Sequence, residues 1–187
     1  KKIDIINLIP LVGFLIQKGK CKFCGSNISK FYLFTEIFFL LIGILLVYNY
    51  GISLSTIIYT IIIFCFYILF VLDYKYLYLP LYINLLIVLI GVTFNAKFQL
   101  FLDETFLILG ITPISFTLYG FFFGYSSLWF INFIYKFIKK KDGIGGGDFI
   151  LFGGIGSIHG PIALPLILLI GSFLGCLYFI FSNKSSN

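Results

Sequence analysis

Long apolar runs, separated by short polar segments, dominate the first half of the chain. The first run covers residues 31–49, and the polar break NYGIS separates it from a second run at residues 52–72. A third run covers residues 79–94. A helix needs about 20 mostly apolar residues to cross a bilayer, so the pattern predicts successive membrane helices.

The third quarter of the chain has a longer and less regular apolar stretch. Residues 105–138 are mostly apolar, with Pro113 and Gly124 inside the stretch. Proline removes a helical hydrogen bond and bends a helix, so we interpret the stretch as one long, kinked span. The alternative is two shorter helices, which would reverse the orientation of everything that follows.

A glycine-rich segment comes next, at residues 143–147, and Asp148 ends it. We expect a short helix from there to about His159, and Pro161 then begins a helix that ends near Phe181. The predicted fold class is therefore all-α, a polytopic membrane bundle of about six membrane helices, the fifth of them short.

Three parts follow from this pattern. Residues 1–30 form a short N-terminal loop that contains cysteines, residues 31–182 form the membrane domain, and residues 183–187 form a tail. The loop holds no apolar run long enough for a signal peptide. Glycines four residues apart, at Gly156 and Gly160 and at Gly171 and Gly175, are expected to allow close helix packing.

Composition and charge support a membrane protein and orient it. The chain is 60% hydrophobic and only 11% charged, with a mean hydropathy of +1.10. All 13 basic residues are lysines, and most of them lie at the ends of apolar runs. Positive residues favour the cytoplasmic side, so we place residues 1–30 and the lysines after residue 135 there. The net charge of +6 is a topology signal and does not indicate nucleic-acid binding.

Three of the seven acidic residues lie at or inside apolar segments, where an ionisable group is a functional candidate. They are Glu36, Asp73 and Asp148. Asp73 ends a helix that runs toward the cytoplasm, and Asp148 begins a helix that leaves it. Both aspartates are therefore expected at the cytoplasmic boundary of the membrane. The alternative is that each aspartate only caps its helix or meets lipid headgroups.

Two carboxylates brought together share a proton, because like charges a few ångströms apart do not both ionise easily. One can act as a base on water while the protonated one polarises a carbonyl. This is the chemistry of an aspartic protease. The glycines before Asp148 permit a close approach of the backbone. Glu36 is expected either to support this site or to have a purely structural role.

A second candidate site lies in the N-terminal loop. Cys21 and Cys24 have the C-x2-C spacing of a zinc knuckle, but they supply only two of the four ligands of a structural zinc site. The motif is therefore half of a metal site. A redox pair and two free thiols are the alternatives. Cys65, Cys176 and His159 are expected to be packing or interfacial residues.

With these motifs in place, the chain resembles the type IV prepilin peptidases, which are GxGD-type membrane aspartic proteases. Three segments carry the resemblance in the expected order: NLIPLVGFLIQKGKCKFCGSNISKFYLFTE, LDYKYLYLP and GIGGGDFILFGGIGSIHG. The matching positions are Asn7, Ile9, Pro10, Gly19, Cys21, Cys24, Tyr32, Glu36, Asp73, Pro80, Gly147 and Asp148.

The resemblance implies that Asp73 and Asp148 are catalytic, with Gly147, Glu36 and Pro80 as supporting residues. It further implies cleavage of the basic leader of prepilins and pseudopilins at the cytoplasmic face of a bacterial inner membrane, with no cofactor for proteolysis. Many bacterial members also methylate the new N-terminus with S-adenosylmethionine, an activity associated with the cysteine loop, where zinc is the expected metal.

The chain departs from the family pattern at several points. Ile150 stands where the family commonly has a lysine, and Leu33 stands where a proline is common. The family's first cysteine pair and first membrane helix are not among the 187 residues, so we expect the chain to be a piece of a longer protein. These departures bear on methylation and zinc binding, whereas the pair of aspartates is complete.

Two other functions remain open at this point. A catalytically degenerate homologue would keep the fold and lose the activity, as the change at Ile150 suggests. A non-hydrolytic transport or assembly component would use its acids to carry protons or ions. The helix centres hold almost no acids, amides or lysines, which disfavours a polar path across the membrane.

Overall fold

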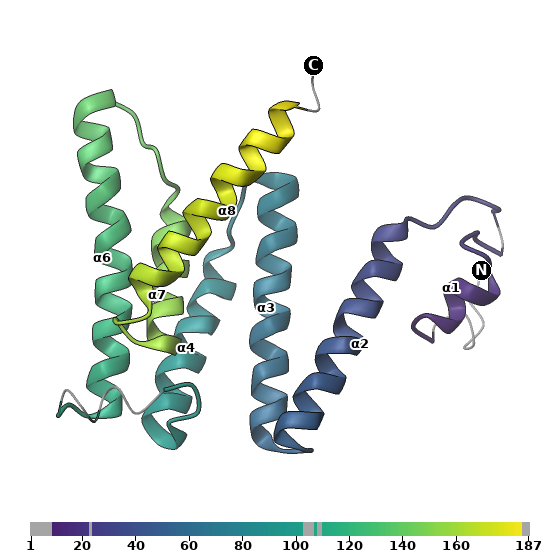
Figure 1. Cartoon of the computed structure of the whole chain (residues 1–187), viewed down its shortest axis with the longest axis horizontal. Helices are drawn as coiled ribbons and strands as arrows, with labels where there is room; N and C mark the ends of the chain where they lie inside the picture. The colour runs from purple at the N-terminus through teal and green to yellow at the C-terminus, as the bar shows by residue number, and fades with distance from the viewer. Residues whose placement is uncertain (1–8, 23, 103–106, 108–109, 185–187) are drawn as a thin grey trace. The chain divides into compact units, whose positions relative to one another are not determined.

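The computed structural model contains helices joined by loops and turns. It describes residues 9–22, 24–102, 107 and 110–184. Asn7 and the last three tail residues, 185–187, lie outside the described residues. The helices are α1 (Val12–Ile16), α2 (Lys30–Tyr50), α3 (Leu54–Tyr76), α4 (Leu81–Phe98), α6 (Pro113–Lys139), α7 (Gly146–His159) and α8 (Leu164–Lys184) (Figure 1).

The fold class predicted from the sequence is confirmed. Five of the described helices, α2, α3, α4, α6 and α8, are long and apolar enough to cross a membrane. The short helix predicted after Asp148 is α7, which has 14 residues. At about 1.5 Å per residue it is too short to cross the hydrocarbon core by itself.

The start of α6 corrects one interpretation of the sequence. Pro113 does not kink the middle of a span, because it occupies the first turn of α6. Proline fits there since its missing N–H would have no helical partner at that position. Thr112 caps the helix by accepting a hydrogen bond from the Ser115 N–H at 3.3 Å. From Pro113 onward α6 is a single helix, and Gly124 lies within it.

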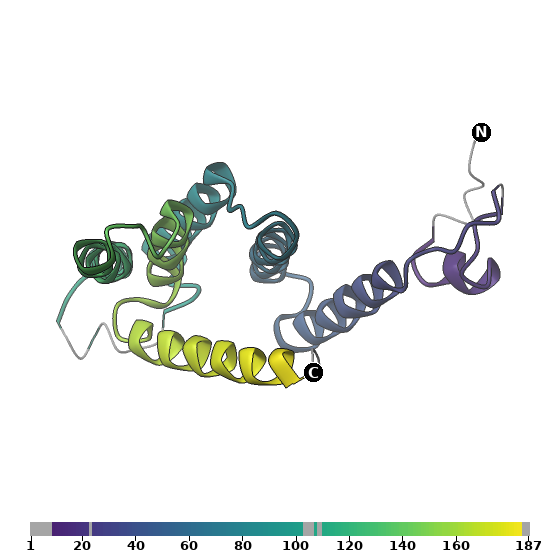
Figure 2. The same ribbon diagram turned by 90° about the horizontal axis from the view of Figure 1, so that it is seen from above.

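The chain divides into two compact units, Lys1–Ile61 and Ile62–Asn187. In the second unit α7 packs against both α4 and α6 (Figure 2). Glycines make the α6–α7 contact close. A Cβ on Gly156 would meet the Gly120 backbone, and a Cβ on Gly124 would lie 2.6 Å from the Phe152 carbonyl oxygen.

The surroundings of each glycine test the close helix packing that was predicted for the two glycine pairs. Gly156 and Gly160 lie against the backbone of Gly120 and the ring of Phe116, so their predicted role in close packing is confirmed. Gly171 and Gly175 have open space where a Cβ would be, so the prediction for that pair is wrong within the described residues. Helix α7 is thus held closely along its length, whereas α8 meets it through few residues.

In the first unit, one hydrogen bond links the N-terminal segment to α2. The Leu11 N–H donates to Glu36 Oε2 at 2.7 Å. Leu11 has a φ of 63° and precedes the first residue of α1, so its N–H has no helical partner. Glu36 therefore has a structural role in this unit, which was one of the two roles expected for it.

Candidate active site

Asp73 and Asp148 line one pocket of about 220 Å³ in the second unit. Asp73 lies in the last turn of α3, and Asp148 lies in the first turn of α7. The other lining residues are Leu77, Tyr78, Leu79, Gly145, Gly146 and Gly147. Two segments that are far apart in the sequence thus place their carboxyl groups at one cavity.

The end of α3 gives Asp73 its place. Leu77 has a left-handed backbone, with a φ of 50°, and its N–H donates to the Asp73 carbonyl at 2.8 Å. This hydrogen bond closes the last turn of α3. The chain then continues through Tyr78 and Leu79 to Pro80, which has a fixed φ and is the residue directly before α4. Pro80 is buried, so the corner between α3 and α4 is firmly packed.

Asp148 is held by the start of its own helix. Its Oδ2 accepts a hydrogen bond from the Gly145 N–H at 3.1 Å, and its own N–H donates to the Gly145 carbonyl at 3.1 Å. Asp148 lies outside the five candidate spans, and burial raises the pKa of its carboxyl above the ordinary value of 3.8. The Gly145 hydrogen bond opposes this shift, and the negative charge of Asp73 adds to it.

Gly147 allows the two segments to approach closely. A Cβ at this position would lie 2.8 Å from the Leu79 Cβ and 3.2 Å from the Leu79 carbonyl oxygen. Both atoms are fixed by the backbone, so a side chain at position 147 would push α7 away from the α3–α4 corner. The structure therefore gives a steric reason for glycine immediately before Asp148.

Two buried asparagines hold the glycine segment from the neighbouring helices. Asn84, in the first turn of α4, is completely buried and donates through Nδ2 to the Gly147 carbonyl at 3.0 Å. Asn132, in α6, is 7% exposed, and its Oδ1 accepts from the N–H groups of Gly143 and Ile144 at 2.8 and 3.0 Å.

Asn132 also links the segment to a surface ion pair. Its Nδ2 donates to Asp142 Oδ1 at 3.1 Å, and Asp142 Oδ2 pairs with Lys136 Nζ at 2.9 Å. The Lys136 and Asn132 hydrogen bonds lower the pKa of Asp142. Asp142 therefore stays charged at neutral pH and keeps its place beside the glycine segment.

No motif in the sequence pointed to Asn84, Asn132 or Asn95. Asn95, near the end of α4, is also fully buried, and it donates to the Ser157 and Ile158 carbonyls at 3.0 and 2.9 Å. All three lie away from the helix centres. The available signal was an isolated amide in an apolar run, because amides in such positions commonly bond a neighbouring helix.

The cysteine loop lies in the first unit and forms a tight turn. The Cys21 N–H donates to the Ser26 carbonyl at 2.8 Å, and the Gly25 N–H donates to the Cys21 carbonyl at 2.9 Å. Hydrogen bonds with Ser26 lower the pKa of the Cys24 thiol to about 7. Such a thiol suits a metal, but the described residues contain no cluster of three or more metal-binding side chains. Within the described residues, the loop therefore offers two candidate ligands, Cys21 and Cys24, and no cluster that would complete a zinc site.

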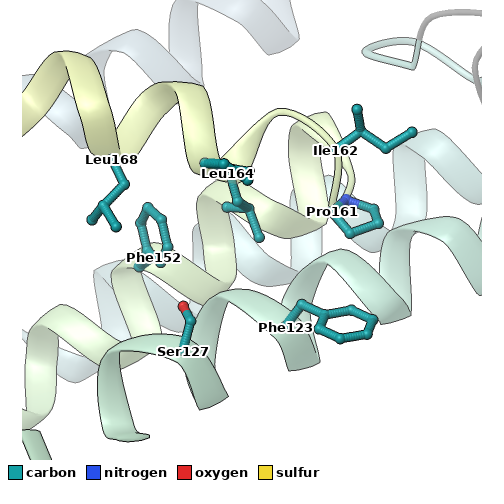
Figure 3. A pocket seen from close by; sticks show the side chains of 8 residues that line it. Phe123, Ser127, Phe152, Pro161, Ile162, Leu164 and Leu168 are labelled. Atoms are coloured by element: carbon teal, nitrogen blue, oxygen red, sulfur yellow. The ribbon is translucent and has the colours of Figure 1, made fainter. Parts of the chain in front are cut away.

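A larger pocket, of about 440 Å³, lies between α6, α7 and the start of α8 (Figure 3). Its lining is apolar except for Ser127, and it contains no titratable side chain. This pocket has a larger volume than the one lined by Asp73 and Asp148, but hydrolysis requires groups that move protons. The smaller pocket is therefore the candidate active site.

The fold and the pocket define a class: a multi-pass membrane protein with two aspartates in one cavity beside a glycine-rich helix start. The sequence model of the type IV leader peptidase family matches residues 59–180, and that of the bacterial peptidase A24 N-terminal domain matches residues 1–50. The chain belongs to the type IV leader peptidase family.

Curated relatives agree with this assignment. The chain is 32% identical over 170 residues to a prepilin leader peptidase/N-methyltransferase of Neisseria gonorrhoeae, a match that covers 89% of the chain and 54% of the relative. It is 29% identical over 182 residues to a protein of the same name from Dichelobacter nodosus, covering 95% and 58%. The chain thus spans little more than half the length of these relatives. No solved structure matches it significantly.

Proposed function

We propose that this chain is the catalytic part of a membrane aspartic endopeptidase that removes the basic leader of type IV prepilins and pseudopilins. The observation that carries the proposal is the pocket shared by Asp73 and Asp148. The family assignment supports it, because the matched region spans both aspartates. In this proposal residues 31–182 form the peptidase domain, Gly147 and Pro80 support the site, and Glu36 keeps the structural role given by its hydrogen bond to Leu11.

The two carboxyl groups have different roles in the proposed reaction. Asp148, whose pKa is raised, holds the proton and donates a hydrogen bond to the scissile carbonyl oxygen. Asp73 takes a proton from water, and the resulting hydroxide adds to the carbonyl carbon while Asp148 transfers its proton to the carbonyl oxygen. The tetrahedral intermediate then breaks its C–N bond. The amine leaves with a proton from Asp73, and Asp148 regains its own.

The proposed location is the bacterial inner membrane, with the pocket facing the cytoplasm. The lysines at the end of α6 lie on the same side as the glycine segment, since only a short loop separates them. Positive residues favour the cytoplasmic side. A prepilin whose apolar segment lies in the bilayer would therefore present its basic leader beside the two aspartates.

Cleavage of a prepilin by the purified membrane protein tests the proposal. We expect the wild-type chain to release the leader, and we expect both Asp73→Asn and Asp148→Asn to abolish release while remaining folded. Asparagine keeps the shape of aspartate but cannot carry the shared proton. A folded wild-type chain without activity would favour the degenerate homologue. Activity that survives either substitution would refute the aspartate mechanism.

We further propose that the complete protein methylates the new N-terminal amine. Two relatives are named prepilin leader peptidase/N-methyltransferase, which favours this second activity. S-adenosylmethionine would supply the methyl group, and the amine would attack it and lose a proton. Zinc bound at Cys21 and Cys24, with further ligands, would order the loop. Transfer of a labelled methyl group to cleaved substrate, with and without a Cys21→Ser change, tests both parts.

A further inference from the structure

We propose that Asn132 and Asn84 are positioning residues that fix the backbone around Asp148 from two sides. The inference rests on the proposed function, because it assigns the two amides a role in that reaction. Neither side chain lines the pocket. Their effect on the reaction is therefore transmitted through the glycine segment that carries Asp148.

Asn132 fixes the beginning of the segment. Its Oδ1 accepts two consecutive backbone N–H groups, those of Gly143 and Ile144, so it holds both peptide planes at once. Its Nδ2 donates to Asp142. This hydrogen bond orients the amide so that Oδ1 faces the N–H groups of Gly143 and Ile144. The side chain is almost fully buried, and both its amide oxygen and its amide nitrogen form hydrogen bonds. Water cannot easily replace a partner held in this way.

Asn84 fixes the end of the segment. Its Nδ2 donates to the Gly147 carbonyl, the peptide group directly before Asp148. The reverse amide orientation would place two oxygens together, so this hydrogen bond assigns the nitrogen. The Asn84 Oδ1 is buried and has no hydrogen-bond partner in the described part of the chain.

The two amides bracket the residues that hold the carboxyl group. Asn132 acts at Gly143 and Ile144, Asn84 acts at Gly147, and the Gly145 N–H between them binds Asp148 Oδ2. Glycine has no side chain to restrain it, and the free segment would sample many backbone conformations. A catalytic group needs its position fixed to within about 0.5 Å. The two asparagines supply the restraint that the glycines lack.

Asn95 provides a matched control at the other end of α7. It is a fully buried asparagine on α4 that donates to the Ser157 and Ile158 carbonyls and accepts from the Phe101 N–H. Its removal breaks three hydrogen bonds, as many as the removal of Asn132 breaks. Its two partners on α7 lie between two and three turns from Asp148. A comparison of the three asparagines thus separates positioning from general stability.

The experiment measures prepilin cleavage and thermal unfolding for Asn132→Ala, Asn84→Ala and Asn95→Ala. We expect the first two to lower kcat per folded enzyme about tenfold or more, with KM within about twofold, because substrate binding is retained while geometry is lost. We expect Asn95→Ala to lower Tm and to leave kcat per folded enzyme within about twofold. Equal kcat values in all three variants would overturn the proposal.

A second pair of variants covers the case in which an alanine variant does not fold. Asn132→Asp puts a second carboxylate beside Asp142, and we expect it to lower kcat. Combining it with Asp142→Asn lets the introduced amide donate to the introduced carboxylate, while the oxygen at position 132 still accepts from Gly143 and Ile144. We expect the double variant to regain most of the lost kcat. No recovery in a folded double variant would contradict the proposed role of Asn132.

Hydrogen exchange separates this inference from the proposed function. We expect Asn132→Ala to increase exchange at the Gly143 and Ile144 amides, whereas Asn95→Ala does not. This result does not depend on any activity. If the wild-type chain cleaves no prepilin, the proposed function fails whatever the exchange shows. If it cleaves and the exchange at these amides is unchanged by Asn132→Ala, only the positioning role fails.

Discussion

A single methyl group added at Gly147 would separate the segments that carry Asp73 and Asp148, the proposed catalytic residues. In Gly147→Ala the new Cβ would lie 2.8 Å from the Leu79 Cβ, whereas ordinary contact begins near 3.4 Å. Neither atom can rotate away, because each is attached directly to the backbone. The helix start that carries Asp148 must therefore move by about 0.6 Å or more relative to Leu79.

The expected loss of activity follows from that displacement. Catalytic groups tolerate about 0.5 Å of error, and a shift of about 1 Å lowers a rate roughly 100-fold. We therefore predict that Gly147→Ala lowers kcat between about 10-fold and 100-fold, equivalent to about 1.4–2.7 kcal/mol in the activation free energy. The predicted change in KM is small, because the pocket stays open to the substrate.

The assay is steady-state prepilin cleavage, with Gly171→Ala as the control. Gly171 lies in α8 and has open space where its Cβ would be, so the same chemical change adds no clash. We expect the control to keep wild-type kcat. Wild-type kcat in a folded Gly147→Ala protein would refute the reasoning, since it would show that the spacing between the segments does not limit the reaction.

Three further predictions concern stability and reactivity. Asp148→Asn should raise Tm near neutral pH. The pKa of Asp148 is raised in the folded state, so its contribution to stability is complete below about pH 3.8 and is lost as pH rises through the folded pKa. A Tm difference between Asp148→Asn and wild type that shrinks with rising pH would contradict this. Gly120→Ala should destabilise the fold by at least about 2 kcal/mol, because the new methyl meets the Gly156 backbone; an unchanged unfolding curve in detergent would refute this contact. Iodoacetamide labelling of Cys24, followed by mass spectrometry, should have a midpoint at about pH 7, and a midpoint near 9.0 would show that the Ser26 hydrogen bonds are absent in solution.

The sequence predicted the helices well, because a membrane imposes a strong and simple pattern. Runs of about 20 apolar residues have few alternatives to a helix in lipid, where backbone groups must bond within their own segment. The error at Pro113 came from interpreting the proline as a kink inside one continuous span. Apolar composition continues across a loop, so only the capping residue Thr112 and the proline after it indicated where the helix begins.

The candidate site was predicted in part. The boundary positions of Asp73 and Asp148 followed from lysine-based topology, and the structure brings both into one pocket. The asparagines that hold the glycine segment were not predicted. Their importance depends on which face of α4 or α6 meets α7, and uniformly apolar helices carry almost no periodic signal for that choice.

Cross-linking between positions 73 and 148, the proposed catalytic pair, tests the central claim most directly. Asp73→Cys and Asp148→Cys would be combined in a chain whose four natural cysteines are replaced by serine, and membranes would be treated with a short bifunctional thiol reagent. The control pairs Asp73→Cys with His159→Cys, at the opposite end of α7. The account predicts an internal cross-link in the first pair and none in the control. Absence of the link in the first pair, with both cysteines reactive, would contradict a shared site for the two aspartates.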